Sequence, residues 1–223
     1  MFAVIFEVNP KPEQWEAYLG YAKMLRPELE RIDGFIDNER FASLCRPGWV
    51  LSLSIWRDEK AVIRWRNFAP HHEVQQKGRS EVFSDYHLRV GEIIADNRLP
   101  TDQNLSELRS DETQVRAKLI ALSEAGLDNL PPRPDALTIA ARLGGPDHAA
   151  QPGLGDWDAF ESINQSGKFI LLTSWRDAPA AAAGRAAPPS SDFRHRRIRV
   201  VRDYGMFDRA EAPQHFPSAT KVV

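Results

Sequence analysis

An internal repeat constrains the fold of this chain more than any other feature. The segment Phe41–Asp58 aligns without a gap on the segment Phe160–Asp177, and seven of the eighteen aligned positions are identical at a constant offset of 119 residues. One identity pairs Trp56 with Trp175, and tryptophan is among the rarest residues in proteins. We interpret the match as an internal duplication, so the chain is expected to build one kind of unit twice.

The length of the chain fits two copies of one unit. Its 223 residues leave room for two domains of roughly 100 residues, which is a usual domain size. We therefore divide the chain into a first unit at residues 1–95, a linker at 96–134, a degenerate repeat at 135–206 and a C-terminal tail at 207–223. Within the linker, the spacing of apolar residues over 110–127 predicts an amphipathic helix.

The first unit alternates strands with helices. An apolar, β-branched run ends at a proline-rich turn, apolar residues at helical spacing follow, and Gly34 ends that helix. The predicted elements are a strand at Phe2–Val8, a helix at Pro12–Ile32, strands at Phe35–Leu44 and Trp49–Trp56, a helix from Asp58 to Gly78 that Pro70 interrupts, and a strand at Phe83–Ile94. The order β-α-β-β-α-β is typical of a ferredoxin-like unit, and the predicted fold class is α+β.

The second unit is predicted to keep its strands and to have reduced helices. We expect a strand at Ala136–Leu143, while Gly144–Asp156 is too short and too rich in glycine and proline for the first helix of the fold. After the repeated hairpin, Ala178–Ala187 forms at most a short helix and Arg196–Tyr204 repeats the closing strand. The tail from Gly205 onward is expected to pack across another part of the chain without regular structure.

Composition excludes several classes of function. The net charge of −2 creates no field that would attract nucleic acid or anionic lipid, and we interpret the basic cluster at 194–199 as the solvated start of a strand. The single cysteine, Cys45, excludes an intrachain disulfide and any cysteine-based metal site. No apolar run approaches the ~18 residues of a membrane span, and the N-terminus has no secretion signal. We expect a cytoplasmic protein without nucleic-acid or membrane partners.

Several motifs of the first unit resemble one protein family. They are Gly34-Phe35, Ser54-Ile55-Trp56, Ala61, Trp65-Arg66, His71 with Gln75, Gly78-Arg79, Tyr86 and Arg89-Val90. Residues 2–95 resemble the antibiotic biosynthesis monooxygenase family of dimeric α/β-barrel proteins. The resemblance implies a ferredoxin-like unit whose sheet pairs with a second sheet, normally from another subunit. The family that the first unit resembles includes cofactor-independent oxygenases acting on quinols and polyketide phenols, haem-degrading enzymes and members without an assigned reaction.

The second copy can supply the partner sheet within the same chain. A four-stranded sheet with helices on one face leaves its other face uncovered, and each large apolar side chain buried there contributes ~1.5–3 kcal/mol. We therefore expect an intrachain pseudo-dimer. Pairing between two chains, and a homodimer in addition, stay open because the ~35-residue linker is long enough for either arrangement.

The resemblance implies a cavity between the helices and the sheet of the first unit. His71 and Gln75 are four residues apart and share a helix face, although Pro70 leaves their local geometry open, and His72 is expected to point to solvent. Trp65 and Phe83 would form an aromatic wall around a ligand.

Three further residues have both a binding and a structural interpretation. Trp56 could extend the aromatic wall, but its recurrence as Trp175 favours packing. Arg79 could orient a polar substrate together with Gln75, or interact as a cation with a helix C-terminus. Asn9 could face the mouth of the cavity, although Asn-Pro is first of all a turn signal.

These residues favour a cofactor-independent monooxygenase. A histidine with a pKa near 6.5, here His71, could remove a proton from a small aromatic or quinol-like substrate and leave an anion that reacts with dioxygen. The same imidazole could instead ligate haem iron, which makes a haem-binding or haem-degrading protein the first alternative. The second alternative is a non-catalytic small-ligand-binding or assembly protein. We find no metal cluster, phosphate loop or Ser/His/Asp spacing in the sequence.

Overall fold

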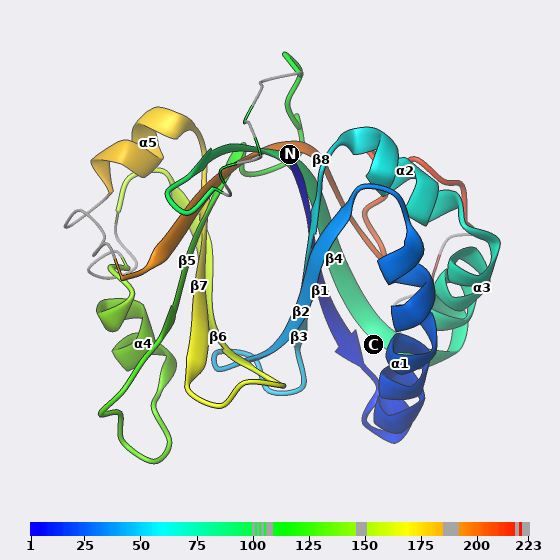
Figure 1. Cartoon of the computed structure of the whole chain (residues 1–223), viewed down its shortest axis with the longest axis horizontal. Helices are drawn as coiled ribbons and strands as arrows, with labels where there is room; N and C mark the ends of the chain where they lie inside the picture. Colours follow the sequence, from blue (N-terminus) through cyan, green and yellow to red (C-terminus); the bar gives the residue numbers. More distant parts are fainter. Residues whose placement is uncertain are drawn as a thin grey trace.

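Eight strands in the described part of the chain hydrogen-bond into one closed barrel, in the order β1-β3-β2-β6-β7-β5-β8-β4 (Figure 1). The computed structural model describes residues 1–99, 101, 103, 105, 109–145, 151–184, 192–216 and 219. The strands are β1 (Phe2–Pro10), β2 (Phe35–Ser43), β3 (Val50–Trp56), β4 (Phe83–Asp96), β5 (Leu119–Gly126), β6 (Leu154–Ser162), β7 (Lys168–Trp175) and β8 (Arg194–Gly205).

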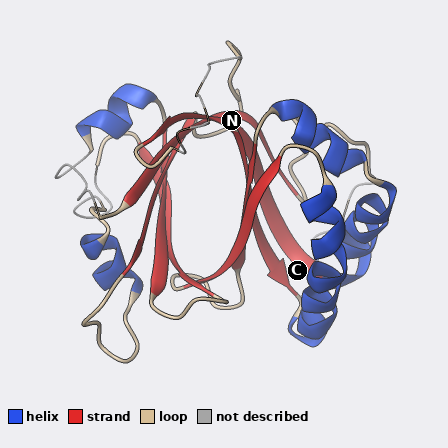
Figure 2. Ribbon diagram, in the orientation of Figure 1, coloured by secondary structure: helices blue, strands red, loops and turns tan. Residues whose placement is uncertain are grey.

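The helices lie outside the barrel, on two opposite sides (Figure 2). They are α1 (Trp15–Arg31), α2 (Glu59–Asn67), α3 (Ala69–Lys77), α4 (Ala136–Arg142) and α5 (Ala178–Ala183), with the short turns η1 (Pro12–Gln14) and η2 (Gly78–Val82). Helices α1 to α3 cover the strands of the first half, and α4 and α5 cover those of the second half (Figure 1). Among the described residues, no helix combines the length and the apolar character needed to cross a membrane.

The two halves of the barrel have the same internal strand order. Strands β1 to β4 are arranged 2-3-1-4, and β5 to β8 are arranged 6-7-5-8. Equivalent edge strands meet at the two seams, since β2 pairs antiparallel with β6 and β4 pairs antiparallel with β8. Both seams join segments of one chain, so the second half closes the barrel as the intrachain arrangement predicts.

The repeated hairpin ends in the same local structure in both halves. The indole nitrogen of Trp56 donates to Ser54 Oγ at 2.9 Å, and that of Trp175 donates to Thr173 Oγ1 at 2.9 Å. The aspartate two residues beyond each tryptophan accepts a hydrogen bond from the third backbone N–H of the next helix, at 2.8 Å in both cases. Such a cap satisfies a backbone donor that the helix leaves free.

Two equivalent glycines allow the helix after each hairpin to pack closely. Gly34 has a φ of 90° and Gly153 a φ of 87°, which L side chains rarely adopt. A Cβ on Gly34 would lie 2.7 Å from Ala61 Cβ, and one on Gly153 would lie 2.5 Å from Ala180 Cβ. Glycine is therefore needed at both positions for the backbone angle and for space.

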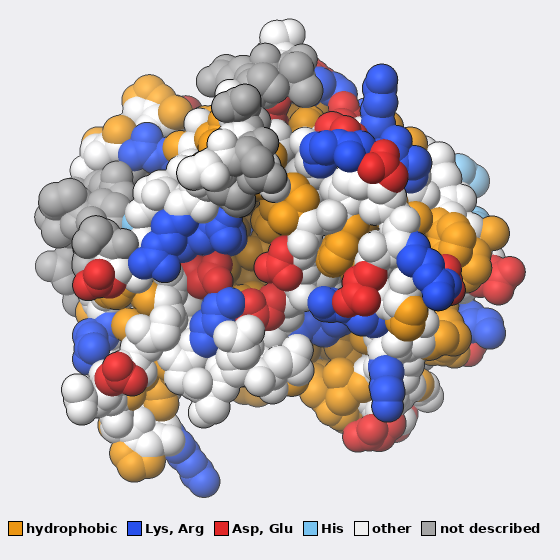
Figure 3. Space-filling model, in the orientation of Figure 1, with side chains coloured by type: hydrophobic (Ala, Val, Ile, Leu, Met, Phe, Trp, Pro, Cys, Tyr) orange, Lys and Arg blue, Asp and Glu red, His pale blue; other side chains and the backbone are white. Residues whose placement is uncertain are grey.

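The barrel interior is apolar in its middle. Alternate residues of each strand point inward and form one cluster, made of Met1, Ala3, Ile5, Phe41, Leu51, Leu53, Ile55, Ile93, Ile120, Leu122, Phe160, Ile170, Leu172, Ile198 and Val200. Charged pairs continue this interior toward the mouth, and the buried Glu7 pairs with Arg89 and Arg46. Acidic and basic side chains alternate across the middle of the molecule in the space-filling view (Figure 3).

The amphipathic helix predicted over 110–127 is wrong, because residues 119–126 form strand β5. This strand is covered on both faces, by the barrel core on one and by Trp175 and the second-half helices on the other. Leu119, Ile120 and Leu122 are all buried as a result, so the apolar pattern does not alternate with the period of a strand. The second half of the sheet thus begins inside the segment predicted as a linker.

The strand predicted at Ala136–Leu143 is also wrong, because residues 136–142 form helix α4. Asp135 caps this helix by accepting from the backbone N–H of Thr138 at 2.7 Å. Ile139, Ala140 and Leu143 are buried and lie on one helix face. The short α5 and the interruption at Pro70, where α2 ends and α3 begins, agree with the sequence predictions.

The basic cluster at 194–199 begins β8 as predicted, but its side chains are not all solvated. Arg196 has a side chain only 3% exposed and pairs with Glu124 at 3.0 Å and with Asp96 at 3.5 Å. Arg194 also pairs with Asp96, at 2.7 Å. Alternate residues of a barrel strand point inward, which brings part of this cluster into the charged interior.

Candidate functional site

A cavity of about 220 Å³ lies between the helices α1 to α3 and the outer face of the first-half sheet. Two rows of side chains that cross β2, β3, β1, β4 and β8 form its floor. The strand pairing gives these rows as Arg40, Ser52, Phe6, Leu88 and Tyr204, and next to them Asn38, Ser54, Val4, Val90 and Arg202. The floor is polar over β2 and β3 and apolar over β1 and β4.

His71 lies in the wall of the cavity at the start of α3. Its Nδ1 is 2.9 Å from the backbone carbonyl oxygen of Trp65, and its ring stacks on the Trp65 indole with centroids 4.1 Å apart. A carbonyl can only accept, so Nδ1 carries the proton and Nε2 of the neutral ring is left as an acceptor. This contact fixes both the tautomer and the ring plane.

Burial lowers the pKa of His71 to about 4, although the contact with the Trp65 carbonyl opposes the shift. The positive charge that His72 can carry lowers the His71 pKa a little further. The sequence expectation of a pKa near 6.5 is therefore corrected. At neutral pH the imidazole is uncharged and its Nε2 is free of a proton.

Four buried polar atoms around the cavity have no hydrogen-bond partner among the described residues. They are Tyr18 Oη, Asn38 Oδ1, Arg40 Nε and Gln75 Oε1, and each of these residues lines the cavity. Burial raises the pKa of Tyr18, and the nearby Arg40 opposes that rise. An orphaned buried polar atom costs about 1–3 kcal/mol, so four in one cavity indicate a place built to receive a polar ligand.

The C-terminal segment 206–216 completes the wall. Arg209 donates to Tyr86 Oη at 2.7 Å and lies 5.2 Å from the ring of Phe216. Phe216 also stacks on His72, with centroids 5.8 Å apart, so the expectation that His72 only faces solvent is corrected. The described part of the tail has no regular structure and packs across another part of the chain, as expected, but its place in the cavity wall was not predicted.

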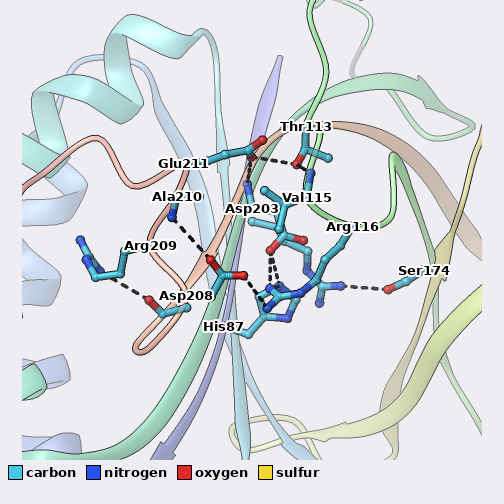
Figure 4. A network of polar contacts seen from close by, with 12 residues as sticks. His87, Thr113, Val115, Arg116, Ser174, Asp203, Asp208, Arg209, Ala210 and Glu211 are labelled. Atoms are coloured by element: carbon cyan, nitrogen blue, oxygen red, sulfur yellow. Dashed lines mark hydrogen bonds and ion pairs between the residues drawn. The ribbon is translucent and has the colours of Figure 1, made fainter. Parts of the chain in front are cut away.

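A polar network holds this segment in place (Figure 4). One carboxylate oxygen of Glu211 accepts from Thr113 Oγ1 and from the backbone N–H of Asp203, both at 2.8 Å, while the other accepts from the backbone N–H of Gln114 at 2.9 Å. Asp203 in turn contacts His87 at 2.7 Å. Burial would raise the pKa of Asp203, but this hydrogen bond and nearby cationic charge hold it below its ordinary value.

Five of the seven candidate residues line one cavity: Trp65, His71, Gln75, Arg79 and Phe83. Arg79 is only 8% exposed and donates to the Met206 carbonyl oxygen at 2.7 Å and to Tyr86 Oη at 3.2 Å. It therefore connects the cavity wall to the tail, and it does not act as a solvent-exposed cation at a helix end.

Trp56 and Asn9 do not line the cavity, which corrects their assignment as substrate-binding residues. Trp56 is completely buried, and its indole packs edge-on against Phe35 with centroids 5.5 Å apart. Asn9 lies at the end of β1, and its Oδ1 is close to Gly48 in the turn between β2 and β3. Both residues have the structural role that their local sequence also indicated.

The sequence analysis missed Tyr18, Arg40, Arg202, Tyr204 and the tail. Arg40 was detectable in principle, because Asn38 and Arg40 are polar residues at alternate positions of one strand and share a face. Arg202 and Tyr204 reach the cavity only through the β4–β8 seam, which no local pattern reveals. Among the described residues, no group of three or more His, Cys, Asp or Glu side chains could hold a metal ion.

The closed eight-strand barrel and the cavity beneath its first-half helices define an α+β barrel protein with a candidate small-molecule site. Comparison with known proteins is more specific. The sequence profile described as "antibiotic biosynthesis monooxygenase" matches residues 1–77. A protein of Pyricularia oryzae named "Jasmonate monooxygenase ABM" is 44% identical over 225 residues, covering 99% of this chain and 100% of that protein. The chain belongs to the antibiotic biosynthesis monooxygenase family.

Solved structures of remote relatives have the same fold. A crystal structure of an aldoxime dehydratase superposes with a TM-score of 0.57 at 12% identity, covering 89% of this chain and 80% of that one. A second aldoxime dehydratase, solved with butyraldoxime, gives 0.56 at 10% identity, with 89% and 78% covered. Identities this low support the fold and say nothing of the reaction.

Proposed function

We propose that the protein is a cofactor-independent monooxygenase that binds a small, largely apolar organic molecule in the cavity beneath α1 to α3. The observation that carries this proposal is the position of His71, whose unprotonated Nε2 belongs to a ring fixed in the wall of an apolar cavity. The family membership and the full-length similarity to a jasmonate monooxygenase support oxygenation as the reaction class. An empty space beside Trp65 also favours ligand binding over a cavity filled by side chains.

His71 is proposed as the base that removes a proton from the substrate. With a pKa of about 4 it is always unprotonated at neutral pH, but it is also a weak base. The neighbouring cations and hydrogen-bond donors must therefore stabilise the substrate anion that forms. The anion reacts with dioxygen, and for an aromatic or quinol-like substrate the four electrons come from the substrate itself. One oxygen atom becomes a carbonyl oxygen and the other leaves as water.

Two substrate classes follow from the residues and from the relatives. The aromatic wall of Trp65 and Phe83 fits a quinol or phenol, which is the class that the sequence predicts. The name of the Pyricularia protein adds jasmonate, a ketone whose carbonyl group acidifies the neighbouring C–H bonds. For this class, oxidation of an acidified CH2 group to a carbonyl, with the second oxygen atom leaving as water, would also take all four electrons from the substrate. Both are small enough to be tested directly.

Haem is the alternative ligand of the same site. Because the Nδ1–H of His71 is donated to the Trp65 carbonyl, Nε2 has the free lone pair that an iron ligand needs. Titration with hemin tests this alternative by the appearance of a Soret band that His71→Ala removes. Without such a band, the proposal of a reaction that needs no cofactor stands.

Oxygen consumption with jasmonate and with a panel of hydroquinones tests the proposed function. We expect uptake by the unmodified protein, a loss of at least tenfold in His71→Ala, and no change in His215→Ala. His215 is an exposed histidine of the C-terminal segment 206–216, so its replacement is a control for the loss of a histidine outside the proposed base position. Ligand binding without oxygen uptake for any substrate would favour a non-catalytic binding protein.

The duplicated architecture is part of the same proposal. We infer that two ferredoxin-like units are fused in tandem, that the second has shortened helices, and that the first holds the site. The matching strand orders and the equivalent tryptophan and glycine positions support this inference.

A further inference from the structure

We propose that the ligand of this cavity is a carboxylate and that the guanidinium of Arg40 binds it. This inference deepens the proposed function and rests on it, because it names the chemical class of the molecule that the same cavity takes. It starts from Arg40, a cavity cation that forms no ion pair among the described residues and that also has a buried nitrogen without a hydrogen-bond partner.

Arg40 projects from β2 onto the cavity floor, opposite Ser52 of β3. Its Nε is buried without a hydrogen-bond partner, and among the described residues no carboxylate forms an ion pair with it. The residue is half-buried, but a buried donor left without a partner costs about 1–3 kcal/mol. An anionic ligand would supply the missing charge and accept from the unpaired nitrogen.

Other arginines that line the cavity already have partners. Arg26 pairs with Glu30 at 2.5 Å and donates to the Asn38 carbonyl oxygen at 2.9 Å. Arg79 and Arg209 donate to Tyr86 Oη and to backbone carbonyl oxygens, which fixes them in the wall.

Arg202 and Arg66 are less suited to a ligand than Arg40. The charge of Arg202 acts on Asp111, and Arg66 contacts Asn67 at 3.4 Å. Neither of them has a fully buried nitrogen left without a partner in the described structure, whereas Arg40 does.

A second donor lies beside Arg40. The hydroxyl of Tyr18 is buried, belongs to a side chain only 6% exposed, and makes no hydrogen bond of standard geometry, although the Arg40 guanidinium lies close enough to act on its pKa by charge and by hydrogen bonding. Its raised pKa keeps it protonated at neutral pH, so it can donate. A carboxylate held by a guanidinium and a phenol hydroxyl would remove two of the four orphaned atoms at once. Asn38 Oδ1 is an acceptor and does not take part in binding an anion.

The floor of the cavity has the polarity that such a ligand requires. Along one row, Arg40 and Ser52 are followed by Phe6 and Leu88 across the sheet. Neighbouring strands lie ~4.8 Å apart, so the span from β2 to β4 is roughly 14 Å. A small acid with its carboxylate at β2 would place an apolar body over β1 and β4.

Binding of matched acids and methyl esters tests this proposal. Jasmonate, octanoate and phenylacetate, each beside its methyl ester, are titrated into the full chain by calorimetry. We expect at least one acid to bind at least tenfold more tightly than its ester. Arg40→Gln should weaken that acid 10- to 100-fold, leave the ester unchanged and so remove the discrimination, because charge-assisted hydrogen bonds are about twice as strong as neutral ones.

Two further variants make the result specific. Arg40→Lys keeps the positive charge but loses the planar guanidinium, and we expect it to retain part of the preference for the acid over the ester. This variant keeps the test valid if Arg40→Gln does not fold. Arg202→Gln removes another arginine of the cavity floor and tests it as the competing carboxylate anchor. Arg176→Gln is the control, because Arg176 is exposed outside the cavity, and it should leave the acid-to-ester ratio within twofold of the unmodified protein. Equal binding of acids and esters, no binding of any acid, or a loss of discrimination in Arg202→Gln with none in Arg40→Gln would overturn the assignment.

Oxygen uptake measured beside binding separates this inference from the proposed function. If acids bind through Arg40 and no oxygen is consumed, the carboxylate site stands and the monooxygenase proposal fails. If acids and esters are oxygenated equally well, the monooxygenase proposal stands and the carboxylate site fails.

Discussion

Replacing Glu211 with alanine should release the C-terminal segment from the barrel. The side chain of Glu211 accepts hydrogen bonds from Thr113 Oγ1 and from the backbone N–H of Asp203, both at 2.8 Å (Figure 4). It accepts a third from the backbone N–H of Gln114 at 2.9 Å. Thr113 and Asp203 are buried, so their donors would be left without a partner. This carboxylate therefore contributes three of the hydrogen bonds that attach the tail to β8 and to the loop before β5.

The size of the effect follows from these three bonds. A hydrogen bond to a charged group contributes about 1.5–3 kcal/mol, and Glu211 is partly exposed, so we take the lower end for each bond. The sum is about 4.5 kcal/mol of lost attachment. Because the tail carries no strand of the barrel, it can undock before the barrel unfolds, and the loss should appear mainly as local opening.

Hydrogen exchange and limited proteolysis measure this opening. In Glu211→Ala, amides of residues 206–216 should exchange roughly 1,000-fold faster, and cleavage in this segment should precede cleavage in the strands. Asp208→Ala is the control, since its ion pair with Arg116 at 3.1 Å is exposed on both sides and is worth less than ~1 kcal/mol. Unchanged protection of the tail in Glu211→Ala would refute the reasoning.

Three other predictions test separate parts of the structure. The kcat/KM of the oxygenation should show no inflection near pH 6.5 from His71 and should decline only toward the His71 pKa of about 4. The free energy of unfolding should fall as the pH drops from 6.5 to 4, because the unfolded chain binds the proton more readily than the folded one. His71→Asn should flatten that fall. Gly78→Ala should destabilise the protein by about 1–3 kcal/mol in urea unfolding, because the new Cβ would lie 2.5 Å from the ring of Phe83. Gly20→Ala is the control and should stabilise by about 0.5–1 kcal/mol, because nothing lies within 4 Å of its new Cβ. Equal effects of the two substitutions would contradict the packing. Glu7→Gln should cost about 3–5 kcal/mol by leaving Arg89 buried and unpaired, and a neutral result would show that water reaches the pair.

The elements of the first half were predictable because each has a local signal. The proline after β1, the helical spacing of α1 and the glycine at position 34 all act within a few residues of where they stand. The interruption at Pro70 has the same local character, since proline is tolerated at the start of a helix and disrupts its interior. Local chemistry decides these boundaries, and the sequence displays it.

The second half was harder because its signals depend on the tertiary structure. Strand β5 is buried on both faces, so its apolar run has no period of two and resembles a helix face. Helix α4 has only seven residues and consists largely of apolar side chains, so it resembles a buried strand. In both cases the spacing of apolar residues depends on how many faces of the element are covered by other parts of the protein. The local sequence does not contain that information.

The candidate site shows the same division. His71, Gln75 and Trp65 come from adjacent turns of one helical region, and their grouping follows from sequence spacing. Arg40 joins them only because β2 lies next to β3, so its position depends on strand register. The pKa of His71 was also out of reach, since burial sets it and burial depends on the whole cavity.

The second half of the chain does more than cover the first. The family profile matches residues 1–77, yet the cavity also requires Arg202 and Tyr204, which the β4–β8 seam places beside β4, and the segment 206–216 that follows them. A first half on its own would expose the edge of β4 and would leave the cavity open on that side. The site therefore depends on the β4–β8 seam. Substitutions that shift β8 against β4 should alter the cavity without touching the helices above it. For the same reason, the sequences of the two halves cannot change independently of each other where β4 pairs with β8.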